Sequence, residues 1–215
     1  MPGKPPTRTP KAVEVEPGSA TSGPPRDTDS EVAVVINGVN KHFGSVHALQ
    51  GLNARIRYGR LTGLVGPDGA GKTTLMRILT GLLAPNSGHA VVAGFDVVDD
   101  NNAIHVATGY MPQRFGLYED LSVMENMRLY AQLRGMDADR NADLFAELLD
   151  FTRLAPFTER LAGKLSGGMK QKLGLACTLM ARPAVLLLDE PGVGVDPVSR
   201  QDLWRMVQAL TDEGM

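Results

Sequence analysis

The chain has 215 residues, of which 43% are hydrophobic and 21% are charged, a composition typical of a globular domain with its own core. The formal net charge is −2, which does not favour a polyanionic partner such as nucleic acid, and the single cysteine excludes an internal disulfide and fits a reducing compartment. The apolar run at residues 184–188 is far too short to cross a bilayer, so any membrane role requires a partner.

The first thirty residues differ in composition from the rest of the chain. Seven of the 14 prolines fall within residues 1–30, with Gly, Ser and Thr between them and few apolar residues. Such a segment cannot bury enough surface to offset the entropy lost on ordering. We therefore expect a disordered Pro-rich tail over residues 1–30, without a secretory signal, and a folded domain over residues 31–215.

The first half of the folded domain alternates between expected strands and one expected helix. Runs of β-branched and apolar residues predict four strands, over residues 32–39, 61–65, 89–93 and 106–111. The second of these leads into a Gly-rich turn and then a helix over 72–82, which Pro85 and Gly88 should end.

The second half begins with a helical stretch between residues 122 and 161, where Ser122 and Glu125 have the spacing of a capping box. A helix opens at Ser166 or Gly167 and runs to about residue 181, and a buried strand over 185–188 follows. The last expected helix, over 198–210, carries four apolar residues on one face: Leu203, Trp204, Val207 and Leu210. This order predicts an α/β fold, with a mostly parallel sheet and an inserted helical subdomain.

Residues 66–73 match the phosphate-loop pattern G-x-x-x-x-G-K-[ST], with a strand before it and a helix after it. The glycines allow a tight turn whose N–H groups point inward, and the following helix presents its positive end to the same phosphates. Lys72 supplies a positive charge to the β- and γ-phosphates, and the Thr73 hydroxyl is a ligand for Mg²⁺. ATP and Mg²⁺ are the expected cofactors, and the expected nucleotide-binding residues of the loop are Gly66, Pro67, Asp68, Gly69, Ala70, Gly71, Lys72, Thr73 and Thr74.

An apolar strand ends in two carboxylates, Asp189 and Glu190. Asp189, at the carboxyl end of the strand, is expected to face Mg²⁺ directly or through water. Glu190 is placed one residue later to polarise an attacking water. Two acidic residues after a buried strand are, on their own, also compatible with a solvated turn, and the phosphate loop makes the catalytic interpretation the stronger one.

Residues 165–171 read Leu-Ser-Gly-Gly-Met-Lys-Gln and resemble the LSGGQ signature of ABC ATPases. A hydroxyl and two glycines at a helix start form a second anion site, although Ser-Gly-Gly alone is more often an ordinary N-cap. The resemblance covers essentially the whole chain from Glu31 onward, with the motifs in the family's order and rough spacing. It implies that Ser166, Gly167 and Gly168 contact the γ-phosphate of ATP held by an opposite ATPase domain, so that two domains close head-to-tail around two nucleotides.

Three further positions take their roles from the resemblance. Gln113 resembles the Q-loop glutamine, which implies contact with Mg²⁺ and the attacking water. Phe43 resembles the aromatic residue that stacks on adenine, with a core aromatic at a strand end as the alternative. Asp196 resembles the D-loop acid at the domain–domain interface and is counted with the nucleotide-binding residues. The implied catalytic residues are Glu190, Lys72 and Gln113, and the implied metal ligands are Thr73, Gln113 and Asp189.

The resemblance also implies a P-loop NTPase with an N-terminal antiparallel β part. The nucleotide-binding core is expected at residues 31–112 and 176–215, and the helical signature subdomain at 113–175. The sequence departs from the family pattern at Asp68, Met169 and Gly192, which replace Asn, Gln and Thr or Ser. None of the four histidines (His42, His47, His89 and His105) lies where the family's switch histidine would follow the last helix, so we expect the C-terminal part of the domain to be missing.

Within the family, residues 110–123 resemble the drug-export class, in particular the first ATPase half of tandem subunits. This implies an ATP-hydrolysing subunit that drives a separate integral-membrane permease, pairs with a second ABC ATPase domain, and lies in the cytoplasm on the inner face of the cell membrane. Leu117, Tyr118 and Met124 are expected either to form a surface for a short permease helix or to pack inside the helical subdomain. The alternatives are a soluble ABC ATPase acting on ribosomes or DNA, and a catalytically weak regulatory half. The short globular interval between the phosphate loop and the signature counts against the DNA-acting members.

Overall fold

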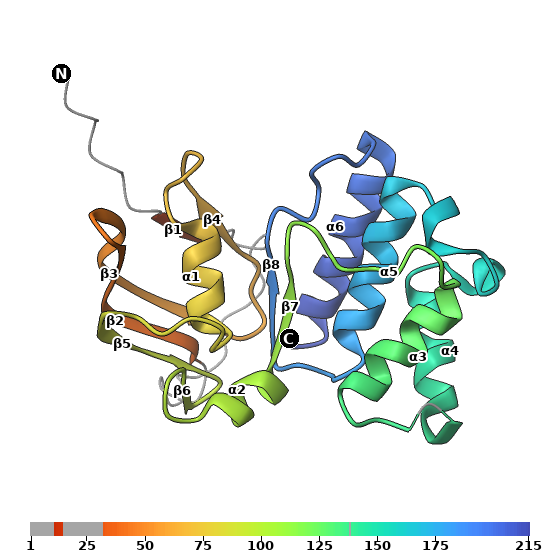
Figure 1. Ribbon diagram of the computed structural model, residues 1–215, viewed down its shortest axis with the longest axis horizontal. Coiled ribbons are helices and arrows are strands. Elements are labelled where there is room, and N and C mark those ends of the chain that lie inside the picture. The colour runs from red at the N-terminus through yellow and green to blue at the C-terminus, as the bar shows by residue number, and fades with distance from the viewer. Residues whose placement is uncertain (1–10, 15–31, 138) are drawn as a thin grey trace, which may run out of the picture. The chain divides into compact units, whose positions relative to one another are not determined.

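The computed structural model describes residues 11–14, 32–137 and 139–215 and divides the chain into two compact units (Figure 1). The first unit contains the chain up to Thr108 together with Thr211–Met215, and the second contains Gly109–Leu210. Most of the strands belong to the first unit and most of the helices to the second.

The first unit is built on a four-stranded sheet in the order β3-β2-β5-β6. Each pair of neighbours in this sheet runs antiparallel, which confirms the expected antiparallel β part. Its centre is β2, whose inward side chains, such as Val34, Ile36 and Val39, are almost fully buried. The four strands are β2 (Val32–Phe43), β3 (Val46–Arg57), β5 (Ser87–Val92) and β6 (Phe95–Asp96).

A second pair of strands in this unit corrects part of the predicted tail. Of residues 1–30 only 11–14 are described, and they form β1 (Lys11–Glu14), paired antiparallel with β4 (Thr62–Val65). These four residues contain no proline, so their N–H and C=O groups can satisfy the edge of β4. The remainder of the predicted disordered tail lies outside the described residues.

The helix after the phosphate loop is shorter than predicted. Helix α1 (Lys72–Leu79) ends well before Pro85, because Gly81 takes a left-handed conformation with φ +71° and donates its N–H to the carbonyl of Ile78. Glycine adopts this conformation without steric cost, and it therefore ends helices at this position.

The strand predicted over 106–111 begins two residues later. Helix α2 (Asn101–Ala107) occupies the preceding positions and buries Ile104, and Thr108 then opens β7 (Thr108–Met111). The Thr108 hydroxyl donates to the carbonyl of Ile104 at 2.7 Å, which satisfies a backbone acceptor at the helix end.

In its described residues, the second unit contains one pair of strands and four helices. Strand β7 neighbours β8 (Val185–Leu188) in a two-stranded sheet. Because β4 belongs to the other unit, a mostly parallel sheet that joins these strands stays a prediction. The helices are α3 (Val123–Leu133), α4 (Ala142–Phe151), α5 (Gly167–Leu179) and α6 (Pro197–Asp212), with short 3₁₀ turns at Asp139–Asn141, Ala155–Phe157 and Ala162–Lys164.

Helix α5 forms the core of this unit. It buries nearly every residue from Leu173 to Leu179, as expected of a helix packed on several sides. In Figure 1 it lies between α6 and the pair α3 and α4. The contacts therefore group β7, β8 and α6 with the helices, whereas the predicted division assigned residues 176–215 to the nucleotide-binding core.

Two sequence-level details of the helices can be compared directly. The Ser122–Glu125 capping box is confirmed: Glu125 N–H donates to Ser122 Oγ, and Ser122 N–H donates to the Glu125 carboxylate. The predicted apolar face of α6 is partly wrong, because Trp204 is 41% exposed and Met206 is buried in its place. Trp204 stands about 100° around the helix from Leu203, outside the stripe that faces the core.

None of the helices in the described part of the chain combines the length and apolar character that a membrane crossing needs.

Candidate nucleotide site

The phosphate loop connects β4 to α1 and has the geometry of an anion cradle. Gly71 has φ +92°, and a Cβ there would lie 2.4 Å from the carbonyl oxygen of Ala48, so glycine is required twice over. No side chain caps α1, and its first intrahelical bond is Leu75 N–H to Gly71. The N–H groups of Lys72, Thr73 and Thr74 precede that bond at the positive end of the helix, as an anion site requires.

Lys72 lies inside this loop and is held by it. Its Nζ donates to the carbonyl oxygens of Gly66 at 2.9 Å and Pro67 at 3.0 Å. Ala70 and Gly71 are buried under the loop, whereas Pro67, Asp68 and Gly69 are exposed. The charge of Asp68, where the family has Asn, is therefore solvated at the outer edge of the loop.

Phe43 lies at the end of β2 and is 51% exposed, so it is not the core aromatic that was the alternative interpretation. The Nζ of Lys41 stands 5.3 Å from its ring centroid, within the range of a cation–π contact. The strand that continues from this hairpin reaches the phosphate loop, because Ala48 and Leu49 are the residues that approach Gly71. A ring stacked on Phe43 is consistent with this position, and the role stays a prediction.

Asp189 follows β8 and is almost completely buried, with 2% of its surface exposed. Its N–H donates to the carbonyl of Met111 at 2.9 Å, which fixes the residue to the end of β7. The Tyr110 hydroxyl donates to its Oδ2 at 3.4 Å, which is a long hydrogen bond. A buried carboxylate at a strand end is a suitable ligand for a hard cation.

Glu190 and Gln113 are brought together although 77 positions separate them in the chain. The Nε2 of Gln113 donates to the Oε2 of Glu190 at 2.9 Å. Glu190 also has φ +51°, an unfavourable backbone conformation for a residue with a Cβ and one that is often found at functional sites. This turn directs the side chain toward Gln113 directly after β8, whose four residues are half-buried rather than buried as predicted.

The segment after Gln113 is anchored by aromatic packing that the sequence did not reveal. Phe115 and Tyr130 stack with ring centroids 5.0 Å apart, and the Tyr130 hydroxyl donates to the carbonyl of Gly116 at 2.8 Å. Phe115 also fills the space above Gly174, where a Cβ would lie 3.1 Å from the ring. The position of Gln113 thus depends on α3 and α5.

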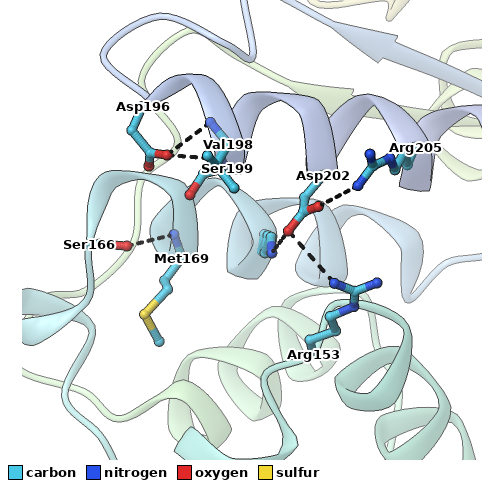
Figure 2. A network of polar contacts seen from close by, with 9 residues as sticks. Arg153, Ser166, Met169, Asp196, Val198, Ser199, Asp202 and Arg205 are labelled. Atoms are coloured by element: carbon cyan, nitrogen blue, oxygen red, sulfur yellow. Dashed lines mark hydrogen bonds and ion pairs between the residues drawn. The ribbon is translucent and has the colours of Figure 1, made fainter.

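The signature residues form the N-terminus of α5. Ser166 is the N-cap and its Oγ accepts the N–H of Met169 at 3.3 Å, as Figure 2 shows. Ser166 and Gly167 are exposed, whereas Gly168 is buried. Two of the three residues are therefore presented at the helix start as an anion site would require.

Asp196 is the N-terminal cap of α6 (Figure 2). Its Oδ1 accepts the N–H groups of Val198 at 3.1 Å and Ser199 at 2.9 Å. The hydrogen bond from the Ser199 N–H, and next to it that from the Ser199 hydroxyl, lower the pKa of the Asp196 carboxyl. Asp196 therefore stays ionised at neutral pH. It follows a loop that packs against the signature, because the carbonyl of Gly194 lies 3.0 Å from a Cβ built on Gly167.

Gly192, where the family has Thr or Ser, is closely covered by α6. A Cβ at this position would lie 2.9 Å from Cδ of Arg200, so a larger residue would require Arg200 to move.

Two groupings of predicted residues result in the second unit: Gln113 with Asp189 and Glu190, and Ser166 to Gly168 with Asp196. The phosphate loop and Phe43 both belong to the first unit.

The geometry agrees with the comparison with known families. A family model described as "ABC transporter" matches residues 49–193. The chain belongs to the ABC transporter family. It is an ATP-binding domain of that family, whose ATP-binding subunits work with permease components in the membrane.

Curated relatives carry the same description in more specific terms. The chain is 60% identical over 188 residues to the "Probable multidrug ABC transporter ATP-binding protein YbhF" of Escherichia coli (strain K12), covering 86% of this chain and 32% of YbhF. It is 36% identical to the "Doxorubicin resistance ATP-binding protein DrrA" of Mycobacterium tuberculosis (strain ATCC 25618 / H37Rv), covering 87% of this chain and 57% of DrrA. The chain thus spans about a third to three fifths of the length of these relatives.

Solved structures share the fold. The ATP-binding subunit of an ABC transporter matches with a TM-score of 0.72 and 25% identity, covering 85% of this chain and 76% of that chain. CbiO1 from Clostridium perfringens matches with a TM-score of 0.74 and 24% identity, covering 85% and 75%. These matches confirm the P-loop α/β fold of ABC ATPases.

Proposed function

We propose that this domain hydrolyses Mg-ATP and that hydrolysis drives a multidrug-type exporter through a separate permease. The observation that carries the hydrolytic part is the 2.9 Å bond between Gln113 and Glu190, beside the buried Asp189. A domain that only binds ATP would not need Glu190 in an unfavourable backbone conformation. The Gln113 amide beside it can share a bound water with the Glu190 carboxylate, as hydrolysis requires. The exporter part rests on the relatives, whose names specify multidrug transport and doxorubicin resistance.

The phosphate loop binds the substrate through its backbone. The three N–H groups at the start of α1 and the Lys72 ammonium together provide several donors for phosphate oxygens. On binding, Lys72 exchanges its bonds to Gly66 and Pro67 for bonds to the phosphates. The flat ring of Phe43 is half exposed and gives the adenine a stacking surface.

Each of the three residues proposed to bind Mg²⁺ carries an oxygen donor. These are the hydroxyl of Thr73 in the first turn of α1, the carboxylate of Asp189 and the amide oxygen of Gln113. When bound, Mg²⁺ would neutralise charge on the β- and γ-phosphates. Gln113 can serve here because its Nε2 bonds Glu190 and its Oε1 remains an acceptor.

Glu190 acts as the residue that orients and polarises the attacking water. Its carboxylate is directed by the turn after β8 and steadied by Gln113, so its position requires little rearrangement before reaction. Lys72 stabilises the negative charge that develops on the transferred phosphoryl group.

The signature completes a second nucleotide site on a partner. Ser166 and Gly167 are exposed at the start of α5, which supports a role in binding the γ-phosphate of ATP on a second ABC ATPase domain. Asp196 would lie at the interface between the two domains. Closure of such a pair would exclude bulk solvent and retain the attacking water beside Glu190.

The permease is expected to contact the surface between Arg114 and Tyr130. Within it Tyr118 is 55% exposed, whereas Leu117 and Met124 are half-buried, so Tyr118 is the most accessible apolar side chain of the three. This surface suits a short amphipathic helix. The domain would then lie on the cytoplasmic face of the cell membrane, held there by the permease.

ATP turnover by the full-length protein tests this function, with wild type compared with Lys72→Ala and Glu190→Gln. We expect both variants to lose turnover, Lys72→Ala because phosphate binding is lost and Glu190→Gln because the water is no longer polarised while ATP still binds. Phosphate release and nucleotide binding are measured on the same preparations. Turnover that survives in Glu190→Gln would instead make this domain a regulatory half that binds ATP while another site hydrolyses it.

A further inference from the structure

Helices α5 and α6 meet at a contact that only glycine permits. A Cβ on Gly168 would lie 2.3 Å from Cβ and 2.5 Å from Oγ of Ser199. Gly168 is buried, whereas its neighbours Ser166 and Gly167 are exposed. The second signature glycine thus faces α6 of its own chain rather than the exposed side of the helix start.

One turn further along both helices, an ion pair joins them again. Lys172 on α5 contacts Asp202 on α6 at 3.4 Å, and their side chains are only 12% and 19% exposed. Asp202 also contacts Arg205 at 3.2 Å and, after α4, Arg153 at 3.7 Å (Figure 2). A partly buried carboxylate with three cationic neighbours resists separation of the elements it joins.

We propose that Ser199 is a positioning residue for the signature: its close contact with Gly168, supported by the Lys172–Asp202 pair, holds α5 and α6 as one body. The two helix N-termini then keep a fixed relation, with Ser166 capping one and Asp196 capping the other. The signature and the D-loop act on the nucleotide together because the Gly168–Ser199 contact fixes the positions of both helix starts. This inference rests on the proposed function only where turnover is measured.

A compensation experiment in the full-length protein isolates the contact. Gly168→Ala should lower the nucleotide-free Tm by roughly 3–10 °C, because the added methyl group cannot fit beside Ser199. Ser199→Gly removes the opposing Cβ, so the double variant should be no less stable than Ser199→Gly alone. Ser199→Ala keeps that Cβ, and a double variant with it should remain as unstable as Gly168→Ala.

A second control uses the adjacent glycine. A Cβ on Gly167 would approach the backbone carbonyl of Gly194 at 3.0 Å and no side chain. Gly167→Ala should therefore not be rescued by Ser199→Gly. If Ser199→Gly restored the Tm of Gly167→Ala as well as that of Gly168→Ala, the substitution would act by loosening the whole unit, and the proposed Gly168–Ser199 contact would be wrong as the cause.

Turnover separates positioning from stability. We expect Gly168→Ala to lower kcat about tenfold or more with KM for ATP little changed, since the helix start is displaced while the phosphate loop is not. Ser199→Gly should return kcat to within about threefold of its own single-variant value. If wild type shows no turnover, the proposed function fails, and the Tm comparison still tests whether Ser199 holds Gly168 in place. If Ser199→Gly rescues neither Tm nor kcat, the proposal is wrong.

Discussion

Glu190, the proposed catalytic carboxylate, has an unfavourable backbone conformation. Its φ of +51° is unfavourable for any residue with a Cβ, and among the described residues only Ala93, Arg153 and Arg182 share this feature without being glycine. Asp189, one residue earlier, is pinned to Met111, so the chain must turn sharply between a buried carboxylate and a partly exposed one. The bond from Gln113 offsets part of this cost and fixes the side chain.

Replacing Gln113 with Ala should lower kcat for ATP about tenfold to hundredfold, because Glu190 loses the donor that orients it. The Kd for ATP should change little, since the phosphate loop is untouched. Steady-state phosphate release and equilibrium nucleotide binding measure the two quantities. Gln113→Glu provides a matched control: it replaces the donating amide with a carboxylate that cannot donate to Glu190, so kcat should fall at least as far as in Gln113→Ala. Unchanged kcat in Gln113→Ala would remove the positioning role.

At the scale of elements, signals that act within a few residues were predictable from sequence. The Ser122–Glu125 box and the Ser166 cap depend only on spacing of three residues, and both form as expected. The phosphate loop was recognisable for the same reason. Strand β3 was overlooked, although its alternation over residues 52–57 is a period-two pattern with the polar side chains exposed.

Other features depend on contacts between distant segments and carry no local signal. The bond from Gln113 to Glu190 and the packing of Phe115 on Gly174 each join residues far apart in the chain. The pairing of β1 with β4 depends on an available strand edge, which composition cannot reveal. The burial of Met206 in place of Trp204 follows from how α6 is rotated against its neighbours. The sequence therefore identified candidate site residues by type, and it did not reveal the partners that the structure gives them.

The Ser122 cap gives a stability prediction for α3. Ser122→Ala removes the acceptor for the Glu125 N–H and should lower the free energy of unfolding by about 1 kcal/mol. Ser122→Asp keeps an acceptor at the same position and should retain most of that stability. Urea unfolding followed by circular dichroism compares the three proteins. Equal stability of the Ala and Asp variants would show that the cap contributes nothing measurable.

At the scale of the whole molecule, burial of titratable groups limits stability at high pH. Burial raises the pKa of Tyr130 to about 12, above the usual value of 10, and it also raises the pKa of the buried Cys177 thiol. For groups whose pKa is higher in the folded state, the contribution to stability is complete below the unfolded pKa and is lost as pH rises through the folded pKa. Because an ordinary thiol titrates near 9 and an ordinary tyrosine near 10, stability should fall as pH rises above about 9 and should continue to fall up to about 12.

Tyr130→Phe separates the titration from the hydrogen bond. Losing the bond to Gly116 should lower stability at every pH, whereas losing the titrating group should flatten the decline between pH 10 and 12. Urea midpoints at pH 8, 10 and 11 give both quantities from one series. A decline as steep in Tyr130→Phe as in wild type would assign the alkaline sensitivity to other groups, Cys177 first.

The contact between Gly71 and Ala48 has a consequence for nucleotide choice. The strand that carries Ala48 begins three residues after Phe43, so the proposed base-stacking residue and the residue packed against the phosphate loop belong to one hairpin. A change that reshapes the hairpin to accept a different base would shift Ala48 and disturb the loop at its tightest point. If Phe43 stacks on the base as proposed, we expect base preference and triphosphate affinity to change together in variants of this hairpin.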